Sequence, residues 1–128
     1  MQISISGMSS LAIYEQIMNQ IKDAIIKKKL QPGEMLPSIR SLAKDLQISV
    51  ITTKRAYDEL EKEGLIKSVA GKGFYVCEQN TDYLREKQTA MLESRFAGVV
   101  QDSKKAGLSL EDILETITIL YENYEELP

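Results

Sequence analysis

The strongest constraint on the fold is the stretch of residues 37–57, whose pattern predicts two short helices joined by a tight turn. Each helix would begin after a serine, Ser38 or Ser49, whose hydroxyl can accept a hydrogen bond from an unpaired N–H of the first turn. Residues that can face inward then recur at steps of three and four. They are Ile39, Leu42, Ala43 and Leu46 in the first helix and Thr53, Ala56, Tyr57 and Leu60 in the second. Only Gln47 and Ile48 separate the helices, so they must cross steeply, as in a helix-turn-helix.

The outward positions of these two helices are basic or carry a hydroxyl group. The basic residues are Arg40, Lys44, Lys54 and Arg55, and the hydroxyl-bearing ones include Ser49 and Thr52. Between Leu36 and Tyr57 only Asp45 is acidic. A face of this kind suits the phosphates and the major groove of DNA. We therefore expect this surface to bind double-stranded DNA.

A β-hairpin is predicted directly after the second helix, over residues 65–77. The β-rich runs LIKSV and FYVC flank a glycine-containing tip. A hairpin in this place is the wing of a winged helix, and Lys72 between Gly71 and Gly73 would bring a backbone and an ammonium group close to DNA. The alternative is an ordinary turn with one solvated lysine. Shape and charge agree on the wing, which favours that interpretation.

Upstream, apolar residues repeat at helical steps over residues 11–29, with Ser10 as the expected N-cap. Lys27, Lys28 and Lys29 would fall in the last turn of this helix. There they would complement the helix dipole, or alternatively contact the DNA backbone. Pro32-Gly33 predicts a turn, and residues 34–36 are long enough only for an edge strand. Gly64 is expected to end the second helix of the central pair, in the left-handed conformation.

Two further amphipathic helices are expected after a linker, over residues 82–105 and, with an apolar stripe from Leu110 to Tyr124, at the end of the chain. Gly107 separates them, and Ser109 with Asp112 resembles a capping box. The apolar stripe of the last helix includes Tyr121 and Tyr124. A two-helix hairpin has one interface and cannot bury both stripes. We expect the remainder to pair with a second copy in a C₂ homodimer; the alternative is a monomer whose tail folds back on the winged helix.

These patterns predict a mostly α-helical fold with one small β-hairpin. Residues 1–78 would form a winged-helix DNA-binding domain, and residues 79–128 a two-helix dimerisation domain. The charges divide in the same way. The first 78 residues carry 11 basic and 9 acidic side chains, whereas the remaining 50 carry 5 and 10. Attraction to phosphate depends on local charge, so the net charge of −3 does not exclude DNA binding.

The composition excludes several other classes of protein. The chain has no histidine, which removes histidine-based metal sites and acid–base catalysis. Its carboxylates form no convergent pair, so neither an enzyme nor a cofactor-binding protein is expected. No stretch approaches a membrane span or resembles a signal peptide. The single cysteine, Cys77, fits a reducing compartment, and we expect a cytoplasmic protein.

Over residues 10–127 the chain resembles the GntR family of bacterial transcription regulators, and within it the short YtrA-like branch. The segments that carry the resemblance are IYEQIMNQIKDAI, LQPGEMLPSIRSLAKDL, KRAYDELEKEGLI and GKGFYV. The resemblance implies a winged helix followed by a C-terminal domain that dimerises and, in many members, binds an effector. The expected function is a sequence-specific, DNA-binding transcriptional regulator, a repressor, that binds a palindromic operator as a dimer.

The resemblance also implies which residues contact DNA. The family's P-S-x-R arginine corresponds to Arg40, and a basic position one turn into the recognition helix corresponds to Lys54. The first turn of that helix, the outward Arg55 and the wing tip complete the set. The expected DNA-binding residues are Arg40, Ser49, Val50, Ile51, Thr52, Lys54, Arg55, Gly71, Lys72 and Gly73.

At three positions the chain departs from the family pattern. Val50 stands in place of a common arginine, Ile51 in place of a polar residue, and Ala70, at the wing, in place of a basic or imidazole side chain. Apolar side chains in a major groove can pack on thymine methyl groups, whereas arginine selects guanine. We therefore expect thymines where related proteins read guanine. The alternative is that Val50 packs inward and only Ile51 is exposed.

The sequence also allows a second role for the winged helix and a place for an effector. A winged helix can also serve as a protein–protein interaction module without specific DNA binding, and an exposed Val50 and Ile51 would suit that role. Any unknown small-molecule effector would bind between subunits, because two helices offer little volume for a pocket. Tyr121 and Tyr124 could line such a site, although core and surface duties explain them equally well.

Overall fold

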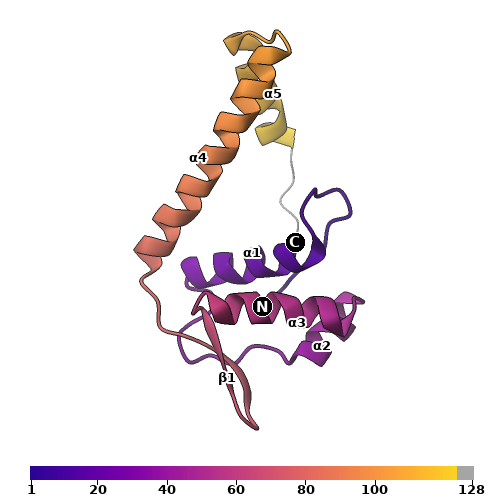
Figure 1. The fold of residues 1–128 in the computed structure, drawn as a ribbon, viewed down its shortest axis with the longest axis vertical. Helices are drawn as coiled ribbons and strands as arrows, with labels where there is room; N and C mark the ends of the chain where they lie inside the picture. Colours follow the sequence, from indigo (N-terminus) through magenta and orange to yellow (C-terminus); the bar gives the residue numbers. More distant parts are fainter. Residues whose placement is uncertain (124–128) are drawn as a thin grey trace. The chain divides into compact units, whose positions relative to one another are not determined.

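The structure is a computed structural model and describes residues 1–123. Its elements, in chain order, are α1 (Ile13–Ile26), α2 (Ile39–Leu46), α3 (Val50–Lys62), β1 (Ile66–Val69), β2 (Gly73–Val76), α4 (Thr81–Lys105) and α5 (Leu110–Asn123). The chain divides into two compact units, with the boundary between Asp82 and Tyr83. Figure 1 shows these elements, and the two units are described separately below.

The first unit is built around α3, which contacts α1, α2 and β1. Figure 1 shows α1 along one side of α3, with α2 and the hairpin on the other. The inward face predicted for α3 is confirmed, because Thr53, Ala56, Tyr57 and Leu60 are all fully buried. In α2, Leu42 and Ala43 are buried, whereas Ile39 and Leu46 are only partly covered. The predicted winged helix-turn-helix is therefore confirmed.

Both predicted serine caps of the helix-turn-helix are confirmed. The Ser38 hydroxyl accepts from the Ser41 N–H at 3.1 Å, and the Ser49 hydroxyl accepts from the Thr52 N–H at 3.0 Å. Between the helices Gln47 adopts φ 55°, a left-handed conformation that turns the chain sharply. Gly64 also has a positive φ, 76°, as predicted for the end of α3. These local signals fix the ends of both helices.

The start of α1 differs from the prediction, since its N-cap is Ala12 and not Ser10. The carboxylate of Glu15 accepts from the Ala12 N–H at 3.3 Å, while the Ser9 hydroxyl accepts from the Leu11 N–H at 3.1 Å. A serine-stabilised turn therefore occupies the residues before the helix. The acidic side chain in the first turn stabilises the helix start in the absence of a serine cap.

The end of α1 also corrects the prediction for the lysine run. The helix ends at Ile26, so Lys27, Lys28 and Lys29 lie beyond its last turn. Lys28 has φ 60°, and the next two N–H groups donate to the Ala24 carbonyl at 2.8 and 3.1 Å. This turn leads to Leu30, which is 4% exposed. Burial of an apolar side chain thus ends the helix before the lysines.

The hairpin pairs β1 with β2 in antiparallel register, with Ile66 opposite Val76 and Val69 opposite Gly73. The predicted edge segment is present as an isolated bridge between Met35 and Tyr75. It follows the predicted turn, in which the Glu34 N–H donates to the Gln31 carbonyl at 3.0 Å and Gly33 has φ 84°. The wing is thereby attached to the segment that leads into α2.

A pair of glutamines on α1 holds the amino-terminal segment, a feature that the sequence pattern did not predict. Gln20 accepts from the Ser4 N–H at 3.0 Å and donates to the Ser4 carbonyl at 2.6 Å. Gln16 accepts from the Ser6 N–H at 2.8 Å and donates to the Ser6 carbonyl at 3.1 Å. The two amides, about one helical turn apart on α1, pair with alternate residues of the amino-terminal segment. We call this arrangement the glutamine clasp.

The second unit consists of α4 and α5. The predicted stop at Gly107 is confirmed by its φ of 84°, and the Ser109–Asp112 capping box by reciprocal hydrogen bonds of 2.9 and 3.1 Å. Hydrogen bonds from the backbone and hydroxyl of Ser109 lower the pKa of the Asp112 carboxyl. Tyr124, expected on the stripe of α5, lies outside the described residues. Among residues 1–123, no helix has both the length and the apolar character that a bilayer-spanning segment requires.

The apolar residues of this second unit are largely uncovered. No residue of α4 is buried, and Ile113 is the single buried residue of α5. Large exposed apolar side chains lie along both helices and include Tyr83, Met91, Leu92, Phe96, Val99, Leu114, Ile117 and Leu120. The hairpin of α4 and α5 alone therefore leaves most of its apolar surface in contact with solvent.

Candidate nucleic-acid interface

The first turn of α3 presents two apolar side chains to solvent. Ile51 is 82% exposed and Val50 is 46% exposed, so the alternative in which Val50 packs inward is wrong. Ser49 caps this turn, and its hydroxyl also donates to the Thr52 Oγ1 at 2.8 Å. The cap fixes the backbone on which Val50 and Ile51 are held. The side chains expected to read bases are thus accessible and rest on an ordered turn.

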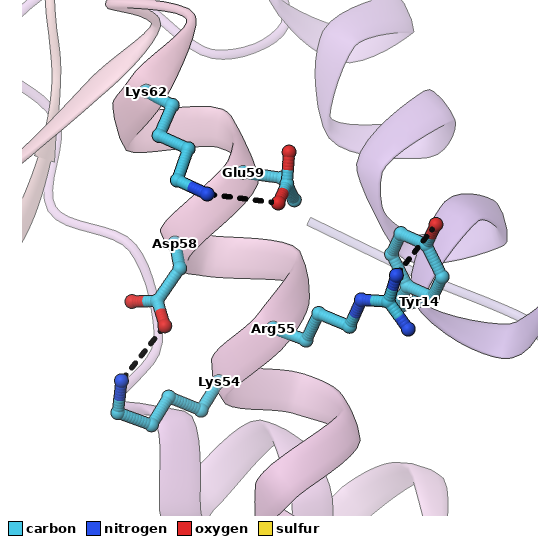
Figure 2. Close-up of polar contacts among 6 residues, drawn as sticks. All are labelled: Tyr14, Lys54, Arg55, Asp58, Glu59 and Lys62. Atoms are coloured by element: carbon cyan, nitrogen blue, oxygen red, sulfur yellow. Dashed lines mark hydrogen bonds and ion pairs between the residues drawn. The ribbon is translucent and has the colours of Figure 1, made fainter.

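Lys54 follows one turn later on the outer face of α3 and forms an ion pair. Its Nζ lies 2.7 Å from the Oδ2 of Asp58, four residues on, and the two side chains are 62% and 43% exposed. Figure 2 shows this pair beside a second one further along the helix, in which Lys62 lies 3.4 Å from Glu59. The lysine expected to bind phosphate is therefore held by a carboxylate in the free chain.

Arg55 points to the other side of α3, toward α1 (Figure 2). Its guanidinium carbon lies 3.8 Å from the centroid of the Tyr14 ring, and its Nη2 donates to the Tyr14 hydroxyl at 3.2 Å. Stacking on an aromatic ring holds a guanidinium group in place without neutralising its charge. Tyr14 lies in the segment whose helical repeat predicts α1, and that repeat gives no sign of its contact with Arg55.

Arg40 is exposed near the start of α2, and that start is anchored to the core. The buried Tyr57 hydroxyl donates to the Pro37 carbonyl at 2.7 Å, and its ring packs edge-on against Phe74 with centroids 5.0 Å apart. Burial raises the pKa of the Tyr57 hydroxyl above its ordinary value of 10.0. Tyr57 therefore ties α3, the wing and the residues before Arg40 together, a role that its place on the apolar stripe did not reveal.

The wing tip is exposed and depends on glycine. Gly71 has φ 73° and Gly73 has φ 120°, conformations that strain any other residue. The Lys72 N–H donates to the Val69 carbonyl at 2.9 Å, which closes the turn. The Lys72 side chain is exposed and makes no ion pair within residues 1–123. The tip thus presents a free ammonium group at the end of the hairpin.

Nine of the ten expected DNA-binding residues lie in α2, α3 or the wing, and the tenth, Ser49, is the cap that precedes α3. All ten belong to the first unit. The four positively charged residues among them differ in their contacts with other side chains. Within the described chain, Arg40 and Lys72 have no acidic partner, Lys54 has Asp58, and Arg55 rests on Tyr14. The first turn of α3 is apolar, and Lys54 and Arg55 follow it on the same helix. An apolar helix start followed by cations fits a groove bordered by phosphates. The contacts themselves stay predictions.

Comparison with known proteins agrees with this geometry. The model of a family described as bacterial regulatory proteins, gntR family, matches residues 13–76. The HTH-type transcriptional repressor YtrA of Bacillus subtilis (strain 168) is 37% identical over 115 residues, which cover 90% of this chain and 88% of that protein.

Two solved structures extend the comparison. YtrA from Sulfolobus acidocaldarius, a GntR-family transcription factor, matches with a TM-score of 0.60 at 35% identity, over 74% of this chain and 97% of that one. AraR(DBD) in complex with operator ORX1 matches with a TM-score of 0.53 at 28% identity, over 59% of this chain and 95% of that one.

Proposed function

Because the chain belongs to the gntR family of bacterial regulatory proteins and is a DNA-binding transcriptional regulator, we propose that it represses transcription as a homodimer on a palindromic operator. The observation that carries this proposal is the exposed first turn of α3, with Ile51 82% exposed and with Lys54 and Arg55 following on the same helix. A module that only binds proteins is not favoured, since its family regulates transcription and a related domain is solved on operator DNA.

The uncovered apolar surface of the second unit supports the homodimer. Burial of apolar surface contributes about 25 cal/mol per Å², so a helix such as α4, without a single buried residue, lacks its main source of tertiary stability. A second copy offers the same stripe, and a twofold axis would cover both stripes at once. Such a dimer would place two α3 helices on one face of DNA, with half-sites about 34–36 Å apart.

Within each half-site, we assign base reading to the first turn of α3. Val50 and Ile51 would pack on thymine methyl groups, whereas the hydroxyl groups of Ser49 and Thr52 suit nearby polar edges. Phosphate binding is assigned to Arg40, Lys54 and Lys72, with Arg55 as a fourth cation on the α1 side. Phosphate contacts fix the position on DNA and the base contacts select the sequence.

Three further assignments complete the proposal. Repression would follow when the operator overlaps a promoter, because the bound dimer excludes polymerase. The protein would act in the cytoplasm, where bacterial DNA is found. A small-molecule effector would act between the paired C-terminal helices, near Tyr121, by changing the angle between subunits and hence the spacing of the α3 helices.

In vitro selection of random duplex DNA with the purified chain tests the proposal directly. We expect an enriched palindrome whose half-sites contain thymines and lie about one helical turn apart. Binding of the selected duplex should weaken with salt, with a slope of about −0.9 for each phosphate contact. Failure to enrich any sequence, or enrichment of a single unpaired half-site, would contradict dimeric operator binding.

A further inference from the structure

Four charged side chains of α4 have no ion-pair partner within residues 1–123. They are Glu93, Arg95, Asp102 and Lys104, and all four are exposed. The ion pairs that the described chain does form lie in its first unit. Figure 1 shows α4 as one continuous helix, so these four positions keep a regular helical phase.

These charges are arranged symmetrically about the middle of the segment 93–104. Glu93 and Lys104 are its two ends, and we call them the outer pair. Arg95 and Asp102 lie two residues inside those ends, and we call them the inner pair. Each pair joins one acid to one base, and its members are eleven or seven residues apart. At 3.6 residues per turn such spacings keep both members on one side of the helix, too far apart along it to contact each other.

The apolar stripe of α4 runs between the two pairs. Leu92, Phe96 and Val99 form its middle part, and each is about half exposed. By helical phase, the inner pair lies along one edge of this stripe and the outer pair along the other. An apolar seam with charges along both edges is the pattern by which paired helices select their partner and orientation.

We propose that two copies of the chain pair through α4 in antiparallel orientation, with the twofold axis passing between residues 98 and 99. This inference rests on the proposed homodimer and specifies its geometry. In such a dimer, residues equally far from the axis on its two sides face each other. Arg95 of one copy would then pair with Asp102 of the second copy, and the outer pair would be matched in the same way. Symmetry doubles both contacts, and the apolar stripes would lie between them.

Other alignments of the same two helices oppose like charges. A parallel pair about a twofold axis places every residue beside its own copy, so each of the four charges would be repelled. An antiparallel pair shifted by one heptad places either Arg95 or Asp102 against itself and separates the outer pair. Like charges across an interface are unfavourable and suppress the wrong pairing. The charges would therefore select the orientation and register, while the apolar stripes would supply most of the affinity.

The test measures the dimer dissociation constant of the full chain by sedimentation equilibrium at low salt. Arg95→Glu replaces attraction with repulsion at two symmetry-related contacts, so it should weaken the dimer about tenfold. Addition of Asp102→Lys restores the inner pair with reversed polarity, and most of that loss should be recovered. High salt should reduce the differences between the variants, because it screens exposed charges.

The same helix supplies a matched control, in which Glu93→Lys is added to Arg95→Glu. This variant has the same net charge as the rescued one, and its changes also lie at exposed positions. It opposes like charges in both the inner and the outer pair, however. We expect it to dimerise no better than Arg95→Glu alone. Circular dichroism of each variant shows that the helix content is kept.

The outcomes separate this inference from the proposed function. If the original chain is a monomer at concentrations that saturate the operator, the proposed homodimer is itself wrong. If the chain is a dimer that Arg95→Glu leaves unchanged at low salt, the homodimer stands and this arrangement of α4 is overturned. Equal recovery in the two double variants overturns it as well, because net charge alone would then govern the association.

Discussion

Tyr57 shows how a single buried side chain connects the core to the proposed DNA-binding face. Its ring is fully buried beside Phe74, and its hydroxyl donates to the Pro37 carbonyl immediately before the cap of α2. Removal of the hydroxyl leaves that carbonyl without this donor while the ring keeps its packing. The position therefore separates hydrogen bonding from hydrophobic burial.

We expect Tyr57→Phe to lower the free energy of unfolding by about 1 kcal/mol, the usual net value of one hydrogen bond. It should also change the response to alkaline pH. The pKa of Tyr57 is raised in the folded state, so its contribution is complete below the unfolded pKa of 10.0 and is lost as the pH rises above it. Denaturant unfolding between pH 9 and about 11.5 measures both effects.

The matched control for this experiment is Tyr121→Phe, at a side chain that is 86% exposed. The hydroxyl is in contact with solvent, so the alkaline loss of stability in this variant should equal that of the original chain. Tyr57→Phe should lose less stability than either protein over the same pH range. Equal losses in all three proteins would show that burial of Tyr57 does not govern the alkaline transition.

At the scale of the elements, the sequence predicted the ends of the helices best. Ser38, Ser49, Gly64 and Gly107 act through hydrogen bonds or a φ angle within a few residues, and such local chemistry is visible in the sequence. The predictions for Ser10 and for the lysine run were wrong. The turn at Ser9 precedes the start of α1, and the burial of Leu30 sets its end. The burial of Leu30 depends on tertiary packing, which no local pattern contains. The hydrogen bond of the Leu11 N–H to Ser9 is local, but the pattern did not distinguish it from a cap at Ser10.

The candidate site was predictable to a similar degree. The exposure of Ile51 follows from helical phase, and the pair of Lys54 with Asp58 obeys the i, i+4 rule, although it was overlooked. The contact of Arg55 with Tyr14 joins residues 41 positions apart, and no periodicity relates them. The glutamine clasp was missed for the same reason, since a polar residue on α1 gave no sign of its partner.

The cap of α3 offers a test at the scale of one element. Ser49→Ala removes the acceptor for the Thr52 N–H, and we expect a loss of about 1 kcal/mol in stability. Ser49→Asp keeps an acceptor and should stay within about 0.5 kcal/mol of the original chain. Its carboxylate would face DNA phosphates, however, so operator affinity should fall further than in Ser49→Ala. Denaturation and retardation of the selected duplex measure the two quantities.

Ser49→Asp should thus be more stable than Ser49→Ala but bind the operator more weakly. This reversal is expected for a cap at a DNA-facing position. If Ser49→Asp bound the operator as tightly as the original chain, the first turn of α3 would not lie against the phosphates. If both variants lost equal stability, the hydroxyl would not act as the cap.

For the whole molecule, the decisive question is what covers α4. Phe96 is 55% exposed on this helix, and a charge there should oppose any apolar pairing. We expect Phe96→Glu to convert the homodimer to monomers and to weaken operator binding strongly, because each half-site would then bind alone. Sedimentation equilibrium and retardation of the selected duplex are the measurements.

Ile119→Glu is the control for this change. Ile119 is 50% exposed, but it lies two residues from both Ile117 and Tyr121 and so on the other side of α5 from the stripe. The dimer should survive this substitution. A chain that sediments as a monomer before any substitution, or a Phe96→Glu variant of unchanged mass, would contradict pairing through these helices.

The glutamine clasp has a practical consequence for handling the protein. It grips peptide groups and makes no use of the Ser4 side chain in its four hydrogen bonds. The identity of that residue is therefore free to vary while the segment stays docked. In a chain whose free Cys77 is first replaced by serine, a thiol introduced as Ser4→Cys would give a single labelling site. The emission of a fluorophore attached there would report when the amino-terminal segment detaches from α1.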